Sequence, residues 1–102
     1  MLNNTAKEMI SSIQVCLKNQ PVDKAWLFGS YSRGEEQPNS DVDILVRYQD
    51  SDSMSLMDIC RIMYAIEDSI GKRVDLVEEG RLIPTAVQNV ERDKILIYER
   101  TA

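Results

Sequence analysis

The sequence contains no histidine among its 102 residues. This absence excludes zinc sites built on imidazole, Ser-His-Asp triads and histidine as a general base. Only two cysteines occur, Cys16 and Cys60, and we expect free thiols on apolar helix faces rather than a disulfide. No stretch reaches the ~18 apolar residues of a membrane-spanning helix, and the first twelve residues lack the pattern of a secretory signal. The sequence therefore predicts a cytoplasmic protein that makes no use of a membrane.

Positive charge is also scarce. Lysine and arginine number 12 against 17 aspartate and glutamate residues, which gives a net charge of −5. This balance argues against a protein that binds duplex nucleic acid stably, because such affinity comes from neutralising phosphates. A nucleotide substrate stays open, since a bound divalent cation can supply positive charge locally. The length predicts a single domain over residues 1–102.

Hydrophobic spacing predicts an α/β (α+β) fold, with a small mixed β-sheet and helices packed mainly on one face. Helices are expected over Ala6–Lys18, between the cap Ser55 and the stop Gly71, and from near Pro84. Strands are expected at Lys24–Phe28, Asp41–Tyr48, Arg73–Glu78 and Lys94–Tyr98. The order along the chain is therefore α-β-turn-β-α-β-α-β.

Two aspartates open the second expected strand, although aspartate is a poor strand former. Side chains alternate across a strand, so Asp41 and Asp43 point to one face and the apolar residues between them to the other. Asp75 has the same position in the third strand, "RVDLVE". If the two strands are neighbours, three carboxylates gather and raise one another's pKa unless a cation compensates. The pattern predicts a site for Mg²⁺, with Mn²⁺ as the alternative.

Two such ions ~3.5–4 Å apart clamp the attacking and leaving oxygens of an in-line phosphoryl displacement. Asp41 and Asp43 lie on one strand and are expected to contact both ions. Asp75 is expected to complete one coordination sphere and to orient or deprotonate the nucleophile. These three residues are the predicted metal ligands and catalytic residues.

A Gly-Ser turn follows the first expected strand. Gly29 allows the backbone to approach a ligand closely, and the N–H groups after it form an anion site to which the Ser30 hydroxyl adds one donor. Arg33 is expected to contact the same phosphates, and Gly34 frees the turn that leads away. The Walker phosphate loop is excluded, because no Lys-Ser/Thr follows these glycines. The turn therefore predicts nucleotide binding.

Each of these features is common on its own. A Gly-Ser turn is usually only a turn, and an Asp-x-Asp pair is more often a solvated strand end than a metal site. Together they form a specific constellation for metal-dependent phosphoryl transfer. On the same face, Leu45 and Val77 need cover from elsewhere, whereas Trp26 and Phe28 are expected in the core rather than stacked on a base.

The motifs resemble those of the minimal members (MNT) of the DNA polymerase β-type nucleotidyltransferase superfamily. The residues that carry the resemblance are Gly29-Ser30, Arg33-Gly34, Ser40-Asp41-x-Asp43 and Asp75. The resemblance runs from "WLFGS" to the last strand and implies the nucleotidyltransferase fold. It also implies transfer of a nucleoside monophosphate from an NTP, expected to be ATP, to an acceptor hydroxyl with two Mg²⁺ ions and release of pyrophosphate.

Larger relatives carry a second helical domain, for which 102 residues leave no room. The resemblance implies a partner instead: minimal members pair with a small helical HEPN protein as its antitoxin, and active ones transfer AMP to a tyrosine of that partner. Two alternatives stay open, a non-catalytic module that masks its partner sterically and a transferase acting on a small molecule such as an antibiotic. Assembly into a homo-oligomer is also left open.

Overall fold

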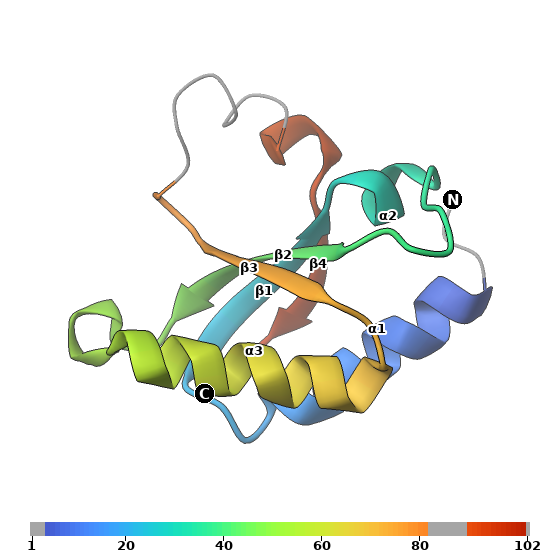
Figure 1. Ribbon diagram of the computed structural model, residues 1–102. Coiled ribbons are helices and arrows are strands. Elements are labelled where there is room, and N and C mark those ends of the chain that lie inside the picture. Colours follow the sequence, from blue (N-terminus) through green and yellow to red (C-terminus); the bar gives the residue numbers. More distant parts are fainter. Residues whose placement is uncertain (1–3, 82–89, 102) are drawn as a thin grey trace.

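The computed structural model describes residues 4–81 and 90–101 (Figure 1). Its elements in chain order are α1 (Asn4–Leu17), β1 (Val22–Phe28), α2 (Ser30–Arg33), β2 (Val42–Tyr48), the 3₁₀ turn η1 (Ser51–Ser53), α3 (Leu56–Ile70), β3 (Val74–Glu78) and β4 (Ile95–Glu99). A further helical turn at 90–93 leads into β4. No helix within the described part of the chain is both long and apolar enough to cross a bilayer.

The four strands form one sheet in the order β3-β2-β1-β4. β1 pairs antiparallel with both β2 and β4, whereas β2 and β3 run parallel. A parallel pair cannot be joined by a tight turn, and the chain makes the return through α3. The predicted mixed sheet is confirmed, and β3 stands at its edge.

Helix α3 begins and ends at the residues that the sequence predicts. The Ser55 hydroxyl accepts from the Asp58 backbone N–H at 3.1 Å, and the Asp58 carboxylate accepts from the Ser55 N–H at 3.0 Å. Gly71 ends the helix at φ 68°, and its N–H donates to the Glu67 carbonyl at 2.8 Å. This capping box and left-handed stop set the two ends of the helix.

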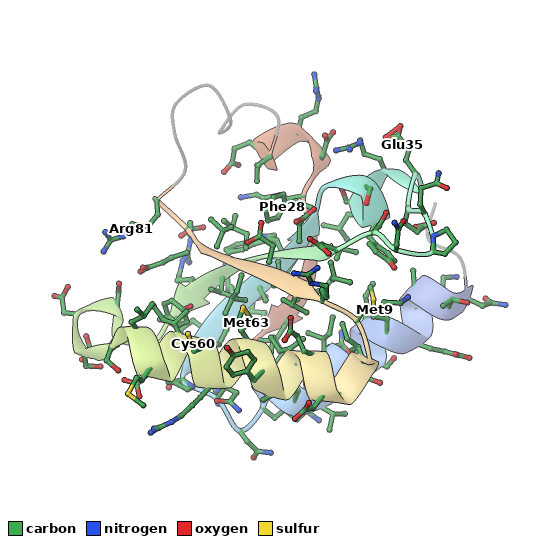
Figure 2. The ribbon with its side chains drawn as sticks, in the orientation of Figure 1. Met9, Phe28, Glu35, Cys60, Met63 and Arg81 are labelled. Carbon is green, nitrogen blue, oxygen red and sulfur yellow. The ribbon has the colours of Figure 1, made fainter. Side chains whose placement is uncertain are left out.

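Helices α1 and α3 cover one face of the sheet, while the turn at 90–93 lies on the other side (Figure 1). The apolar cluster between these two helices and the sheet is fully buried along the middle of β2, where Ile44 is 0 % exposed. Burial of a side chain of this size contributes ~1.5–3 kcal/mol. The residues that build this cluster from the two helices are Met9, Ile13, Leu17, Ile62 and Ile66, and Figure 2 shows Met63 on the side of α3 that faces β3.

A second, smaller cluster lies on the opposite face, which we call the open face. It consists of Trp26, Leu45 and Val90, with Phe28 and Val77 packed against it. Leu45 is only 1 % exposed, so the cover that it needs comes in part from the helical turn at 90–93. The prediction that Trp26 belongs to the core is confirmed.

Several predicted boundaries were wrong by one or two residues. The first bond that joins β2 to β3 is donated by the Val42 N–H to the Arg73 carbonyl at 2.9 Å. Asp41 and Arg73 therefore precede their strands instead of opening them. Lys94 does not belong to β4, because its N–H donates at 2.8 Å to the Val90 carbonyl in the preceding helical turn.

Two elements begin earlier than expected. β1 begins at Val22 rather than Lys24, since Val22 pairs with Tyr48 across an irregularity in the ladder. Helix α1 begins at Asn4 and ends at Leu17. The helix expected from Pro84 starts outside the described residues. Cys16 and Cys60 are free, as predicted.

Candidate active site

Asp43 and Asp75 are direct neighbours in the parallel β2–β3 register. Adjacent strands lie ~4.8 Å apart, so the two carboxylates start from neighbouring points of the sheet. Both belong to the set of residues that includes Leu45 and Val77, which places them on the open face. Asp43 is half-buried and Asp75 is exposed. The two strands are therefore neighbours, which is the condition on which the predicted carboxylate site depends.

Gly29 connects the predicted phosphate turn to these carboxylates. Gly29 follows Phe28, the last residue of β1, and Phe28 pairs with Asp43 of β2. A Cβ added to Gly29 would stand 2.1 Å from Oδ2 of Asp43, so the carboxylate packs directly against the glycine backbone. Gly29 also has φ 74° and ψ −152°, a conformation open essentially to glycine alone. The close approach of Gly29 and Asp43 joins the predicted phosphate turn to the predicted metal ligands.

Ser30 is the first residue of α2, immediately after Gly29. The turn is closed by two bonds to the Gly29 carbonyl, from the Ser32 N–H at 3.1 Å and from the Ser32 hydroxyl at 2.7 Å. Gly34 ends α2 at φ 71°, as expected for a residue that frees the chain to turn away. Gly29, Ser30 and Gly34 thus form one short, hydrogen-bonded turn beside Asp43.

Arg33 lies at the end of α2 and is exposed. Its guanidinium forms ion pairs with Glu35 at 2.5 Å and with Asp93 at 3.5 Å. Arg33 and Asp93 line a small hollow of about 60 Å³ together with Phe28, Gly29 and Val90. Asp93 was not foreseen, because it comes sixty residues later in the chain and no local pattern links the two.

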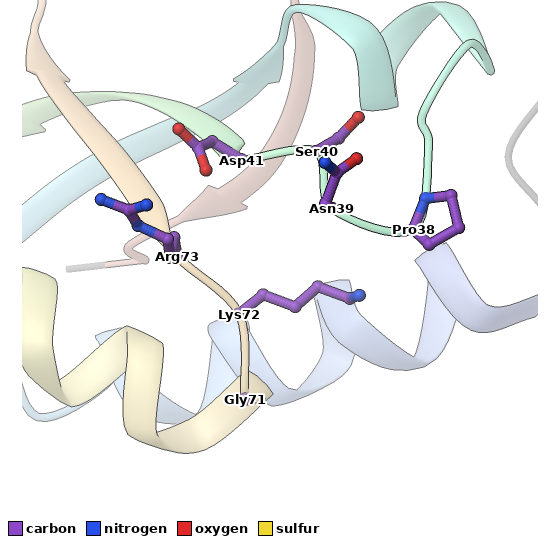
Figure 3. A pocket seen from close by; sticks show the side chains of 7 residues that line it. All are labelled: Pro38, Asn39, Ser40, Asp41, Gly71, Lys72 and Arg73. Carbon is purple, nitrogen blue, oxygen red and sulfur yellow. The ribbon is translucent and has the colours of Figure 1, made fainter.

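Asp41 stands one residue before β2 and is exposed. It lines two hollows. The first, about 350 Å³, lies between residues 38–41 and 71–73 (Figure 3). In this view the side chains of Lys72 and Arg73 point in opposite directions, with Arg73 on the side of Asp41.

The second hollow, about 420 Å³, lies beside β3, and we call it the edge hollow. Asp41 and Asp75 both line it, so it connects the two outer carboxylates of the predicted triad. The other residues that line it are Met63, Tyr64, Glu67, Arg73 and Val74. Tyr64 was not predicted from the sequence, although an exposed aromatic residue on an amphipathic helix is a detectable signal.

The electrostatics of the site centre on Asp43. Its pKa is raised above the usual value, first by burial and then by the negative charges of Asp75 and Asp41, while Arg33 opposes the shift. Three carboxylates therefore interact here, as the sequence predicts, and the nearby arginine does not neutralise them. Such an excess of negative charge favours a bound cation.

The donor set suits a hard divalent ion, because Asp41, Asp43 and Asp75 offer only carboxylate oxygens. Over residues 4–81 and 90–101, no three histidine, cysteine, aspartate or glutamate side chains converge closely enough to hold an ion. Mg²⁺ is commonly held by one or two carboxylates together with substrate phosphates rather than by a closed protein cage. The exposed side chains of Asp41 and Asp75 can rotate, so the residues present fit an ion that arrives with a nucleotide.

Comparison with known proteins identifies the family. The profile described as "Polymerase beta, Nucleotidyltransferase" matches residues 11–102. A protein of Methanocaldococcus jannaschii, provisionally named a protein adenylyltransferase, is 39 % identical over 72 residues, which cover 71 % of this chain and 74 % of that protein. The resemblance inferred from the motifs is thereby confirmed.

Solved structures agree with this assignment. One, provisionally described as a minimal nucleotidyltransferase, is 30 % identical, has a TM-score of 0.75 and covers 93 % of this chain and 95 % of its own. A complex of tri-AMPylated Shewanella oneidensis HEPN toxin with MNT antitoxin shares the fold, with a TM-score of 0.69 at 20 % identity over 93 % of this chain and 73 % of its own. This chain belongs to the polymerase β family of nucleotidyltransferases.

Proposed function

We propose that this chain transfers AMP from ATP to a hydroxyl group of a partner protein, as the antitoxin of a HEPN-type helical toxin in the cytoplasm. The observation that carries the proposal is the pairing of Asp43 with Asp75 against the backbone of Gly29. Two likenesses support the choice of acceptor. The relative from Methanocaldococcus jannaschii bears an adenylyltransferase name, and the solved complex contains an AMPylated HEPN toxin with its antitoxin.

The reaction forms one bond and breaks one. The acceptor oxygen attacks the α-phosphorus of ATP, the bond from that phosphorus to the bridging oxygen of the β-phosphate breaks, and pyrophosphate leaves with the electron pair. The hydroxyl proton passes to a carboxylate at the acceptor side, a role that suits the exposed Asp75. Gly29 and Ser30 would bind the phosphate tail, and Arg33 would add positive charge there.

Asp41, Asp43 and Asp75 would hold Mg²⁺ or Mn²⁺, and the site as predicted takes two ions. When bound, the metal supplies positive charge to the phosphate oxygens and to the leaving pyrophosphate. The side chains contribute position: Asp43 is held by its neighbours in the sheet, whereas Asp41 and Asp75 are free to follow the substrate.

The test uses ATP labelled at the α-phosphate, Mg²⁺ and the protein co-expressed with its toxin partner. We expect the label to appear on the partner. An Asp43→Asn variant should lower this transfer by about 10²–10³-fold, as removal of one electrostatic group in an active site does. Asp68→Asn is the matched control, because Asp68 is an exposed aspartate of α3 that lines none of the hollows described above.

Three outcomes decide between the alternatives. Loss of both labelling and neutralisation of the toxin in Asp43→Asn supports the proposed reaction. Unchanged neutralisation by an Asp41→Asn/Asp43→Asn variant would show that the chain acts by steric masking. Labelling of an aminoglycoside in place of the partner would identify a small-molecule transferase.

A further inference from the structure

The open face is not equally accessible on its two sides. On the side of β1 and β4, the cluster of Trp26, Leu45 and Val90 is buried. The Lys94 ammonium lies 4.6 Å from the centroid of the Trp26 ring and closes this side further. On the side of β3, the edge hollow of about 420 Å³ begins at Asp75. Among the described residues, the edge hollow therefore gives access to Asp41 and Asp75 past the edge of the sheet.

The strand order gives the reaction a direction. The Gly29 turn follows β1, Asp43 lies on β2 and Asp75 lies on β3, and these strands are adjacent in that order. An in-line displacement needs the attacking and leaving oxygens on opposite sides of the phosphorus. With the phosphate tail at Gly29 and the reacting phosphorus near Asp43, the attacking hydroxyl stands at Asp75.

At Tyr64 the edge hollow meets an exposed apolar stripe of α3, which consists of Met57 and Tyr64. Tyr64 lines the hollow and is 57 % exposed, and Met57, two helical turns earlier on the same stripe, is 67 % exposed. Tyrosine and methionine are enriched at interfaces between protein chains, so these two side chains suit a surface that binds another chain. The side chain of Arg73 borders the same hollow and supplies its positive charge.

The edge of β3 offers backbone groups to an extended chain. Within the described residues, no strand pairs with its outer side. The first outward N–H, that of Val74, donates to the Glu67 carboxylate at 2.9 Å, a contact that blunts the edge at one end. The rest of the short strand leads from Asp75 toward Glu78.

We propose that the edge hollow and the Met57–Tyr64 stripe of α3 bind the acceptor segment of the partner, as an extended polypeptide whose hydroxyl side chain enters beside Asp75. This inference rests on the proposed function and adds to it the path of the acceptor. It predicts that the distance of a hydroxyl from Tyr64, rather than its identity, decides whether it receives AMP.

A tethered acceptor tests the path without knowledge of the natural sequence. The probe is a maleimide-linked Gly/Ser peptide that ends in serine, threonine and tyrosine, attached to Tyr64→Cys in a Cys16→Ala/Cys60→Ala background. A short flexible tether gives an effective concentration in the mM range, about as high as saturating substrate. The matched control carries the same peptide at Val15→Cys, because Val15 is an equally exposed apolar residue, at 63 %, on the other helix.

With α-labelled ATP and Mg²⁺, we expect at least about tenfold more label on the peptide at position 64 than at position 15, a ratio that a local mM concentration readily produces. Adding Asp43→Asn to the Tyr64→Cys variant should remove that label. Equal labelling at both positions, or more at position 15, overturns the proposed path and leaves the nucleotidyltransferase function intact. No labelling of either peptide or of the co-expressed partner, in a protein that binds ATP and melts cooperatively, overturns the proposed function and the path with it.

Discussion

Alternate residues of β2 face two different environments. Val42 and Ile44 point to the helix-covered face and are fully buried, whereas Asp43 points to the open face and is held half-buried against Gly29. Leu45 also lies on the open face and belongs to a cluster much smaller than the core on the other side. One strand therefore supplies stability through one face and chemistry through the other, and substitutions of adjacent residues should separate the two.

The largest effect on stability is expected for Ile44→Ala. Removing a fully buried side chain from the large cluster should lower the free energy of unfolding by about 2–5 kcal/mol. Leu45→Ala removes a side chain of the same size from the open face. The loss of stability should be smaller there, because the half-buried Phe28 and Val77 can relax into the space. Urea unfolding of both variants measures the difference, and an equal loss would contradict the division of roles between the faces.

Next in size is Gly29→Ala. The substitution forces a side chain into a positive-φ conformation and brings its Cβ to 2.1 Å from Oδ2 of Asp43, so the carboxylate must move. Gly71→Ala is the matched control, because Gly71 also has positive φ but no atom within 4 Å of the added Cβ. Strain alone costs about 1–2 kcal/mol, which is the loss expected for Gly71→Ala.

Gly29→Ala should lose at least as much stability as Gly71→Ala, and should also lose AMP transfer while Gly71→Ala keeps it. Thermal unfolding and the transfer assay measure the two properties in parallel. Retention of transfer in Gly29→Ala would show that the close contact with Asp43 does not matter for the reaction.

A smaller effect, of opposite sign, is expected for Asp43→Asn. Burial and two neighbouring carboxylates raise the pKa of Asp43 in the folded state, so the folded protein loses stability as the pH rises through that pKa. At pH 7 without metal, Asp43→Asn should therefore be more stable than the wild type by about 0.5–2 kcal/mol, the usual range for stabilising substitutions. Urea unfolding at pH 7 and pH 4 with EDTA measures this, and the gain should shrink at the lower pH.

The last effect concerns the helix-covered face and appears only at high pH. Burial, together with the nearby Glu78 carboxylate, raises the pKa of Tyr48 to about 12. Since the phenol of an unfolded chain ionises near pH 10, this contribution to stability is complete below pH 10 and is lost as the pH rises toward 12. The slope of unfolding free energy against pH between 10 and 12 should be reduced in Tyr48→Phe. Equal slopes in the two proteins would rule out this role.

The arrangement of the candidate site was largely predictable because its residues follow the alternation of side chains along a strand. Asp43 and Asp75 each interrupt an apolar strand at an alternate position, and the register of β2 with β3 then makes them neighbours. The Gly29 turn was readable because a glycine at the end of a buried strand is a local signal. The caps Ser55 and Gly71 were readable for the same reason.

The parts that escaped prediction depend on contacts between distant segments. No local sequence pattern predicts the ion pair of Arg33 with Asp93 or the packing of Val90 on Leu45. Asp41 was placed in the strand because alternation continues through it, whereas the first bond between β2 and β3 forms only at Val42. Local patterns give the alternation of a strand but not the residue at which its partner begins.

The short connection from α3 to β3 has a consequence for how this site tolerates changes in chain length. Only residues 71–73 separate the end of the helix from the strand. Deleting Lys72 would slide β3 by one residue, so that Leu76 would stand beside Asp43 and Asp75 would turn toward the helices. An insertion of similar size in residues 49–55 would be absorbed by the loop before α3. The pairing of Asp43 with Asp75 therefore depends on the exact number of residues in the connection 71–73, whereas the length of the loop at 49–55 can vary.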